Sequence, residues 1–196
     1  SITEYSPQFM DANKFRSIFK TYNNLLSERG LLDFDDILTE CYTILKENPD
    51  ILEFWQERFK YILVDEFQDI NPVQYEIMKL LASKYTNIFA VGDDDQSIYS
   101  FRGSKPELMF KLMNDFPNKN EFELSANFRS SESVVKSSSE FISSNKRRKA
   151  KSLFAVNDTD GFCIKKSLPG YEEEYDYITD EIMKIKAVNG KCSSTD

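Results

Sequence analysis

Apolar side chains follow two patterns along this chain, a helical period and short continuous runs, and each change of pattern marks the edge of an expected element. Between Phe15 and Leu26 they recur every three or four residues, which predicts an amphipathic helix ending near Gly30. Asp33 is a suitable N-cap for a second helix, and Pro49 begins a third. The same period predicts further helices at residues 72–85, 106–116, about 131–144 and 172–188.

Short continuous apolar runs between these helices predict buried strands. They lie at residues 61–65, 87–92, 121–124 and 162–168. Asn71, Pro72 and Gln74 follow the first run and form the pattern of a capping box with proline in the first turn. Because strands alternate with helices, we expect an α/β fold with a mostly parallel sheet.

The composition fits a globular protein and excludes several classes. The chain has 196 residues, of which 40% are hydrophobic and 30% charged, and no apolar run reaches the length of a membrane span. The first residues lack a secretory signal, so we expect a reducing, cytoplasmic location. With three separated cysteines and no histidine, a zinc site is not expected. Any proton transfer must then fall to a carboxylate, lysine, tyrosine or cysteine.

Acidic residues follow the first two predicted strands. Asp65 and Glu66 end the first, and Asp93–Asp95 with Gln96 end the second. Ligands of open α/β sheets bind at these carboxyl ends, and neighbouring residues point to opposite sides. One acid of the first pair can therefore face a Mg²⁺ ion while the other activates a water molecule. The alternative is that these acids cap the following helices or lie in solvated turns.

Two further segments are candidates for contacts with nucleotides or nucleic acid. Arg129 precedes a predicted helix, where a cation is well placed for phosphate, although an ordinary surface arginine is the alternative. Tyr99 and Phe101 can stack on bases with Arg102 on a phosphate, or both rings can belong to the core. The formal net charge of −8 argues against non-specific coating of nucleic acid, but it leaves room for a local basic groove.

Four segments resemble motifs of superfamily 1 DNA helicases of the UvrD/PcrA/Rep type. VDEFQDINPVQ is similar to their motif II, VGDDDQSIYSFRG to motif III and LSANFRSS to motif IV. DFDDIL matches a segment that precedes motif II in that family. The order and approximate spacing agree over roughly residues 15–170. The resemblance implies a partial RecA-like lobe of the P-loop NTPase type and the start of a second lobe.

The resemblance also implies residue roles in ATP hydrolysis. Asp65 would bind Mg²⁺, largely through water, and Glu66 would activate the hydrolytic water. Gln96 would sense the γ-phosphate and link it to the DNA site. Arg129 would be one of two arginine fingers. Phe128 takes the place of a tyrosine that stacks on adenine, and its ring keeps the π-face.

The remaining implied roles concern coupling and DNA. Gln68 would couple motif II to its neighbours. Tyr99, Phe101 and Arg102 would contact single-stranded DNA, with Phe101 standing where many relatives have tryptophan. The basic run at residues 146–151 is expected to be a solvated helix end.

The phosphate-binding loop of this family is missing from the sequence. A P-loop needs GxxxxGK[ST], and Gly190-Lys191 has Ile185 and Cys192 at two required positions. We therefore expect a fragment of an ATP-dependent 3′→5′ helicase that is inactive alone. Residues 1–125 would belong to lobe 1A and residues 126–196 to lobe 2A. A nucleotide-independent interaction module and, less favoured, a metal-dependent nuclease are the alternatives.

Overall fold

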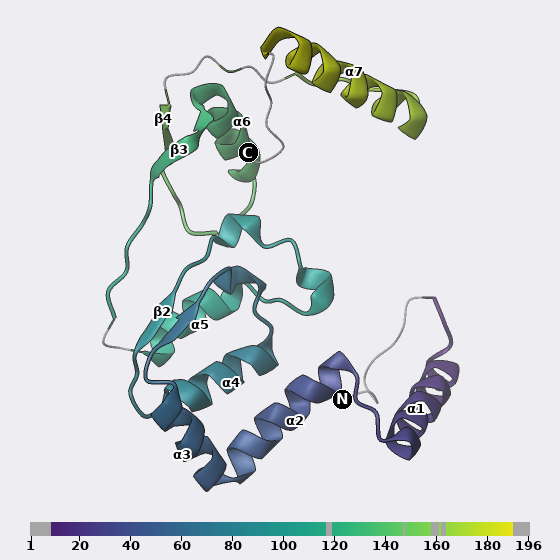
Figure 1. Cartoon of the computed structure of the whole chain (residues 1–196), viewed down its shortest axis with the longest axis vertical. Coiled ribbons are helices and arrows are strands. Elements are labelled where there is room, and N and C mark those ends of the chain that lie inside the picture. Colours follow the sequence, from purple (N-terminus) through teal and green to yellow (C-terminus); the bar gives the residue numbers. More distant parts are fainter. Residues whose placement is uncertain (1–8, 117–118, 147, 158–160, 162–163, 190–196) are drawn as a thin grey trace. The chain divides into compact units, whose positions relative to one another are not determined.

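The computed structural model describes residues 9–116, 119–146, 148–157, 161 and 164–189 (Figure 1). The chain divides into two compact units. The first contains residues 1–122 together with residues 147–149, and the second contains residues 123–146 and 150–196. Among the described helices, none has the length and apolar character needed to cross a membrane.

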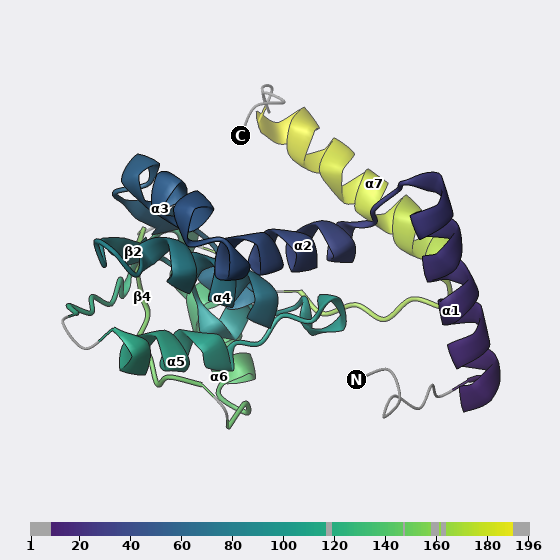
Figure 2. The same ribbon diagram turned by 90° about the horizontal axis from the view of Figure 1, so that it is seen from below.

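The first unit contains five helices and two strands in its described part. In chain order they are α1 (Ala12–Arg29), α2 (Phe34–Glu47), α3 (Pro49–Arg58), β1 (Ile62–Val64), α4 (Pro72–Ala82), β2 (Ile88–Ala90) and α5 (Glu107–Asp115). Three short 3₁₀ turns are η1 (Phe67–Asp69), η2 (Asp94–Gln96) and η3 (Ser100–Arg102). Both α2 and α3 pack against α4 (Figure 2).

Local capping explains where these helices begin and end. The side chain of Asp33 accepts from the backbone N–H of Asp36, and the reciprocal bond completes a capping box. Asn71 and Gln74 form the same motif at the start of α4. Gly30 ends α1 in the left-handed conformation, at φ 62°. The predicted starts of α2 and α4 and the end of α1 are confirmed.

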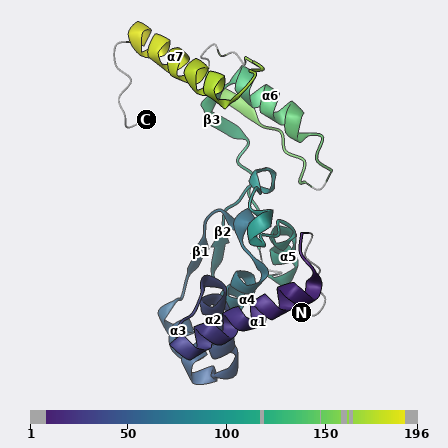
Figure 3. The same cartoon turned by 90° about the vertical axis from the view of Figure 1, so that its right-hand side faces the viewer.

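The sheet of the first unit consists of β1 and β2, which pair in parallel with Val64 opposite Ala90 (Figure 3). One face packs on a buried cluster formed by Phe67, Ile70, Tyr75, Met78 and Leu108. The opposite face carries Leu63 and Phe89, which are 73% and 61% exposed. The expected α/β fold with parallel pairing is confirmed.

Helices α4 and α5 are joined by a charged cluster around one buried tyrosine. The Tyr75 hydroxyl donates to Asp115 Oδ2 at 2.9 Å, and the ring is completely buried. Lys79 and Lys111 place their ammonium groups 2.7 and 3.3 Å from the same carboxylate oxygen. The hydrogen bond from Lys79, followed by those from Tyr75 and Lys111, lowers the pKa of Asp115 to about 2.

Two predictions about strands are wrong, and the strand pair found instead lies in the second unit. Its elements are β3 (Ala126–Ser131), α6 (Glu132–Ile142), β4 (Phe154–Asn157) and α7 (Tyr171–Asn189). Residues 121–124 form no strand, and Phe122 and Leu124 are 84% and 85% exposed. Residues 164–168 form none either, while 162 and 163 lie outside the described residues. Apolar sequence makes a strand only where a partner is available, and here β3 pairs with β4 instead.

Candidate active site

The carboxyl ends of β1 and β2 bring the two acidic segments together. The backbone N–H of Val91 donates to the carbonyl of Val64 at 2.9 Å. The N–H of Phe67 then donates to the carbonyl of Val91, also at 2.9 Å. Parallel pairing thus continues past the last strand residues. It places the segment after Val64 beside the segment after Val91.

Glu66 stands at a sharp turn of the backbone. Its φ and ψ are 49° and 44°, the left-handed region that non-glycine residues rarely occupy. The carboxylate of Asp65 accepts from the N–H of Glu66 at 2.9 Å, which supports this conformation. Both side chains are exposed. Backbone strain of this kind concentrates at functional sites, where surrounding contacts hold the residue in place.

Gln68 connects the two acidic segments through its side-chain amide. Its Nε2 donates to Glu66 Oε2 at 2.7 Å, and its Oε1 accepts from the backbone N–H of Asp93 at 3.0 Å. The residue is 2% exposed. A buried amide that uses both its donor and its acceptor orients both partners. The structure therefore brings Glu66 and Asp93 into one hydrogen-bonded group.

Gly92 leaves the space that Gln68 occupies. A Cβ atom at this position would lie 2.8 Å from Gln68 Oε1 and 3.2 Å from the backbone nitrogen of Gln68. These separations are shorter than ordinary van der Waals contacts, so a larger residue would displace the amide. The glycine is needed here for close approach of the two segments.

Asp93 and Gln96 form the second half of the group. Asp93 Oδ1 accepts from the backbone N–H of Asp95 at 3.1 Å, and its Oδ2 accepts from Gln96 Nε2 at 2.8 Å. The N–H of Gln96 also donates to the carbonyl of Asp93 at 2.9 Å. One continuous path of hydrogen bonds therefore runs from Glu66 through Gln68 and Asp93 to Gln96.

A compact carboxylate cluster lies in this second segment. One ligand oxygen each of Asp93, Asp94 and Asp95 falls within 4.8 Å of the others. Asp65 and Glu66 lie outside this group. The metal-dependent nuclease, the less favoured alternative, would need several carboxylates such as Asp65 and Asp93 to converge on shared metals, and this cluster gives it no support. Carboxylate oxygens are still suitable ligands for Mg²⁺, and Asp65 is exposed at the strand end.

Arg148 is a contact residue that sequence reasoning missed. Its Nε and Nη2 donate to the two carboxylate oxygens of Asp95 at 2.7 and 2.6 Å. The run at residues 146–151 was expected to be a solvated helix end, and at Arg148 this expectation is wrong; Arg147 lies outside the described residues. No local pattern links Arg148 to Asp95, because they are 53 residues apart in the chain.

The candidate DNA-contacting residues gather at η3. The guanidinium carbon of Arg102 lies 4.8 Å from the ring centroid of Tyr99 and 5.4 Å from that of Phe101. The two rings are 5.9 Å apart and tilted by 56°. Phe101 is 77% exposed, so its ring is not part of the core. An exposed phenyl face beside a cation is the arrangement that single-stranded nucleic acid binders use.

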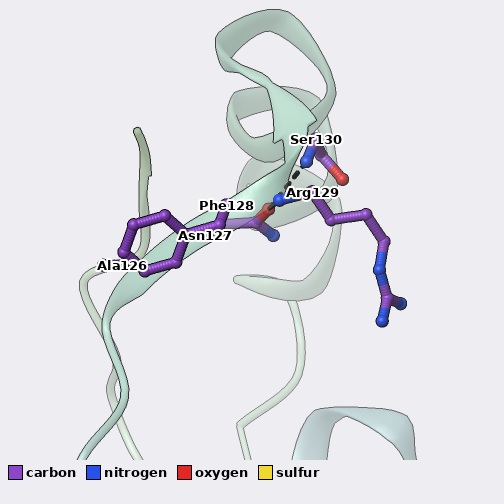
Figure 4. A pocket seen from close by; sticks show the side chains of 5 residues that line it. All are labelled: Ala126, Asn127, Phe128, Arg129 and Ser130. Carbon is purple, nitrogen blue, oxygen red and sulfur yellow. Dashed lines mark hydrogen bonds between the residues drawn. The ribbon is translucent and has the colours of Figure 1, made fainter. Parts of the chain in front are cut away.

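Phe128 and Arg129 lie on β3 of the second unit. Figure 4 shows their side chains leaving opposite sides of the strand around an open pocket lined by residues 126–130. Asn127 Oδ1 accepts from the backbone N–H groups of Arg129 and Ser130 at 2.9 and 2.8 Å. Phe128 is 74% exposed, and Arg129 is also exposed. The ring and the guanidinium are thus accessible within this unit.

Comparison with known proteins identifies the class. Residues 3–117 match the model of the UvrD/REP helicase N-terminal domain, and the chain belongs to this family. The predicted resemblance is confirmed, and the fold is that of a partial RecA-like α/β lobe.

Individual relatives extend this match. The chain is 48% identical over 141 residues to a putative ATP-dependent DNA helicase YjcD of Bacillus subtilis, covering 72% of this chain and 19% of that protein. It is 36% identical over 194 residues to ATP-dependent DNA helicase PcrA of Staphylococcus aureus, covering 96% of this chain and 25% of that protein. The PcrA of Staphylococcus epidermidis is also 36% identical, over 188 residues. The chain spans about a fifth to a quarter of the length of these relatives.

Proposed function

We propose that this chain is part of an ATP-dependent DNA helicase that couples ATP hydrolysis to 3′→5′ movement on single-stranded DNA and to duplex unwinding. The observation that carries the proposal is the hydrogen-bonded path from Glu66 through Gln68 to Asp93 and Gln96. It connects a candidate base for water with a candidate sensor of the terminal phosphate. The names of the relatives support the same activity.

The residues of the first unit would divide the chemistry between them. Asp65 would hold Mg²⁺, which would neutralise charge on the phosphate oxygens. Gln68 orients the Glu66 carboxylate through Oε2, so that its other oxygen can accept a proton from the attacking water. The side-chain amide of Gln96 donates one N–H to Asp93, and its other N–H would donate to a phosphate oxygen.

The second unit would supply contacts to the nucleotide. Arg129 would stabilise charge on the transferred phosphoryl group, and Phe128 would stack on adenine. Their exposure within the unit is compatible with both roles. In this proposal residues 1–125 belong to lobe 1A and residues 126–196 to lobe 2A. The remainder of the helicase chain and single-stranded DNA would be the partners, in the cytoplasm.

The 196 residues contain no GxxxxGK[ST] segment, so the backbone amides that hold the phosphates would come from elsewhere in the protein. We therefore expect the purified chain to show no DNA-stimulated ATP hydrolysis. ATP turnover by this chain that Glu66→Gln abolishes would contradict that expectation.

The helicase proposal itself is tested in the longer protein that carries this chain. Unwinding of a duplex with a 3′ single-stranded tail should require ATP and should be lost in Glu66→Gln. Unwinding that does not require ATP, or that persists in Glu66→Gln, would contradict the proposal. A protein that binds a partner equally well with and without nucleotide would favour an interaction module instead.

A further inference from the structure

We propose that Arg148 is a positioning residue for the turn Asp94–Gln96, and that it holds Gln96 in the orientation needed for phosphate sensing. The contact between Arg148 and Asp95 is observed in the structure and does not depend on the proposed function. Its consequence for catalysis rests on the proposed function.

The pair differs from an ordinary surface ion pair in its geometry. Two nitrogens of Arg148 reach the two oxygens of Asp95, at 2.7 and 2.6 Å, which is the bidentate arrangement that only arginine can make. The two side chains are 16% and 11% exposed, so solvent screens the charges only weakly. Such a pair fixes the orientation of the carboxylate as well as its charge.

A second set of contacts holds the neighbouring residue at the same turn. The backbone N–H of Lys149 donates to Asp94 Oδ2 at 2.7 Å. The Lys149 ammonium also pairs with the carboxylate of Glu121. Residues 148 and 149 belong to the first unit by their contacts, although the chain has passed through β3 and α6 in between. The basic segment therefore attaches to the acidic turn at consecutive residues.

The contact between Arg148 and Asp95 influences Gln96 through the Asp93 carboxylate. One oxygen of Asp93 accepts from the N–H of Asp95, and the other accepts from the side chain of Gln96. A displacement of Asp95 would therefore disturb the same carboxylate that orients Gln96. Three adjacent carboxylates also repel one another, and the guanidinium of Arg148 offsets this repulsion.

The first test measures hydrogen exchange at the backbone amides of Asp95 and Gln96 in the 196-residue chain. Arg148→Ala should accelerate exchange at both amides by about tenfold, with the amides of α4 unchanged. Arg148→Lys should give an intermediate acceleration, because one ammonium cannot replace the fork. Lys149→Ala is the matched control, since it removes a neighbouring cation but keeps the N–H that bonds Asp94.

A second variant keeps the test decisive if Arg148→Ala does not fold. Asp95→Asn leaves the arginine in place and should accelerate the same two amides. Adding Arg148→Ala to Asp95→Asn should give little further change, since the two residues act through one contact. Unchanged exchange in the folded Arg148 or Asp95 variants, additive effects, or an equal response to Lys149→Ala overturns the proposal.

Activity in the longer protein separates this inference from the helicase proposal. Arg148→Ala should lower kcat for ATP hydrolysis several-fold with a smaller change in KM, whereas Lys149→Ala should leave both unchanged. Altered exchange together with unchanged kcat overturns the catalytic consequence of the contact. If neither the parent protein nor any variant hydrolyses ATP, the proposed function fails. The exchange measurement then still shows whether Arg148 holds the turn Asp94–Gln96 in place.

Discussion

The side-chain oxygen of Gln68 accepts a hydrogen bond from the backbone N–H of Asp93 at 3.0 Å and thereby joins the ends of two parallel strands. The same amide donates to Glu66. A residue that is 2% exposed thus sets the relation between the two halves of the candidate site. Core packing and the site depend on one side chain, which makes Gln68 the first residue to test.

Gln68→Leu should destabilise the first unit and impair ATP hydrolysis in the longer protein. Leucine has similar volume but leaves the Asp93 N–H without its acceptor and Glu66 without its donor, at a cost of about 2 kcal/mol. Urea unfolding followed by circular dichroism measures the loss. A variant as stable as the parent would show that water replaces both hydrogen bonds.

Gly92→Ala should act through Gln68. The added methyl group would approach Gln68 Oε1 to 2.8 Å, and displacing the amide should cost about 1–3 kcal/mol of unfolding free energy. The same substitution in a Gln68→Ala background is the control, because the amide is then absent. Equal losses in both backgrounds would show that Gln68 is not the residue that Gly92 accommodates.

Acid should weaken the contact between α4 and α5. The pKa of Asp115 is lowered to about 2 from an ordinary 3.8, chiefly by its bond from Lys79. A lowered carboxyl pKa contributes stability above the unfolded value, and this contribution is lost as the pH falls from about 4 to 2. Allowing for solvent screening, this contribution to the free energy of unfolding is about 1 kcal/mol.

Asp115→Asn provides the comparison for that pH dependence. The free energy of unfolding, measured in urea, should differ between parent and variant at pH 6, and the gap should narrow on acidification to pH 2. A gap that stays constant over this range would show that the ionised carboxylate is not what stabilises the contact.

Phe101→Ala should weaken binding of single-stranded DNA in the longer protein without loss of stability. Its ring is 77% exposed, so truncation removes little packing, whereas one stacked base is worth about 1–3 kcal/mol. Fluorescence anisotropy with a labelled oligonucleotide measures the change. Phe122→Ala is the matched control, since that ring is 84% exposed in the same unit but outside η3. Equal effects of the two substitutions would argue against a specific role for Phe101.

Much of the candidate site could be predicted because its motifs are local. Asp65 and Glu66 directly follow a short apolar run, and Gln96 follows the next one. Parallel pairing then brings the two strand ends together without further information. The bidentate pair of Arg148 with Asp95 was missed, because a basic run is usually solvated and no neighbouring residue indicates which carboxylate Arg148 contacts. The pairing of β3 with β4 was also missed, because nothing in either segment indicates which distant segment it pairs with.

The sequence by itself determined where α2 and α4 begin and where α1 ends, because a cap such as Asp33 with Asp36 joins residues only three positions apart. It also determined the family, since the motif residues are contiguous in the chain. Only the tertiary structure decided that Gln68 bonds Asp93 across 25 residues and that Arg148 bonds Asp95 across 53. The physical reason is that an amide or a guanidinium can bond many partners, and the fold alone selects which of them lies within reach.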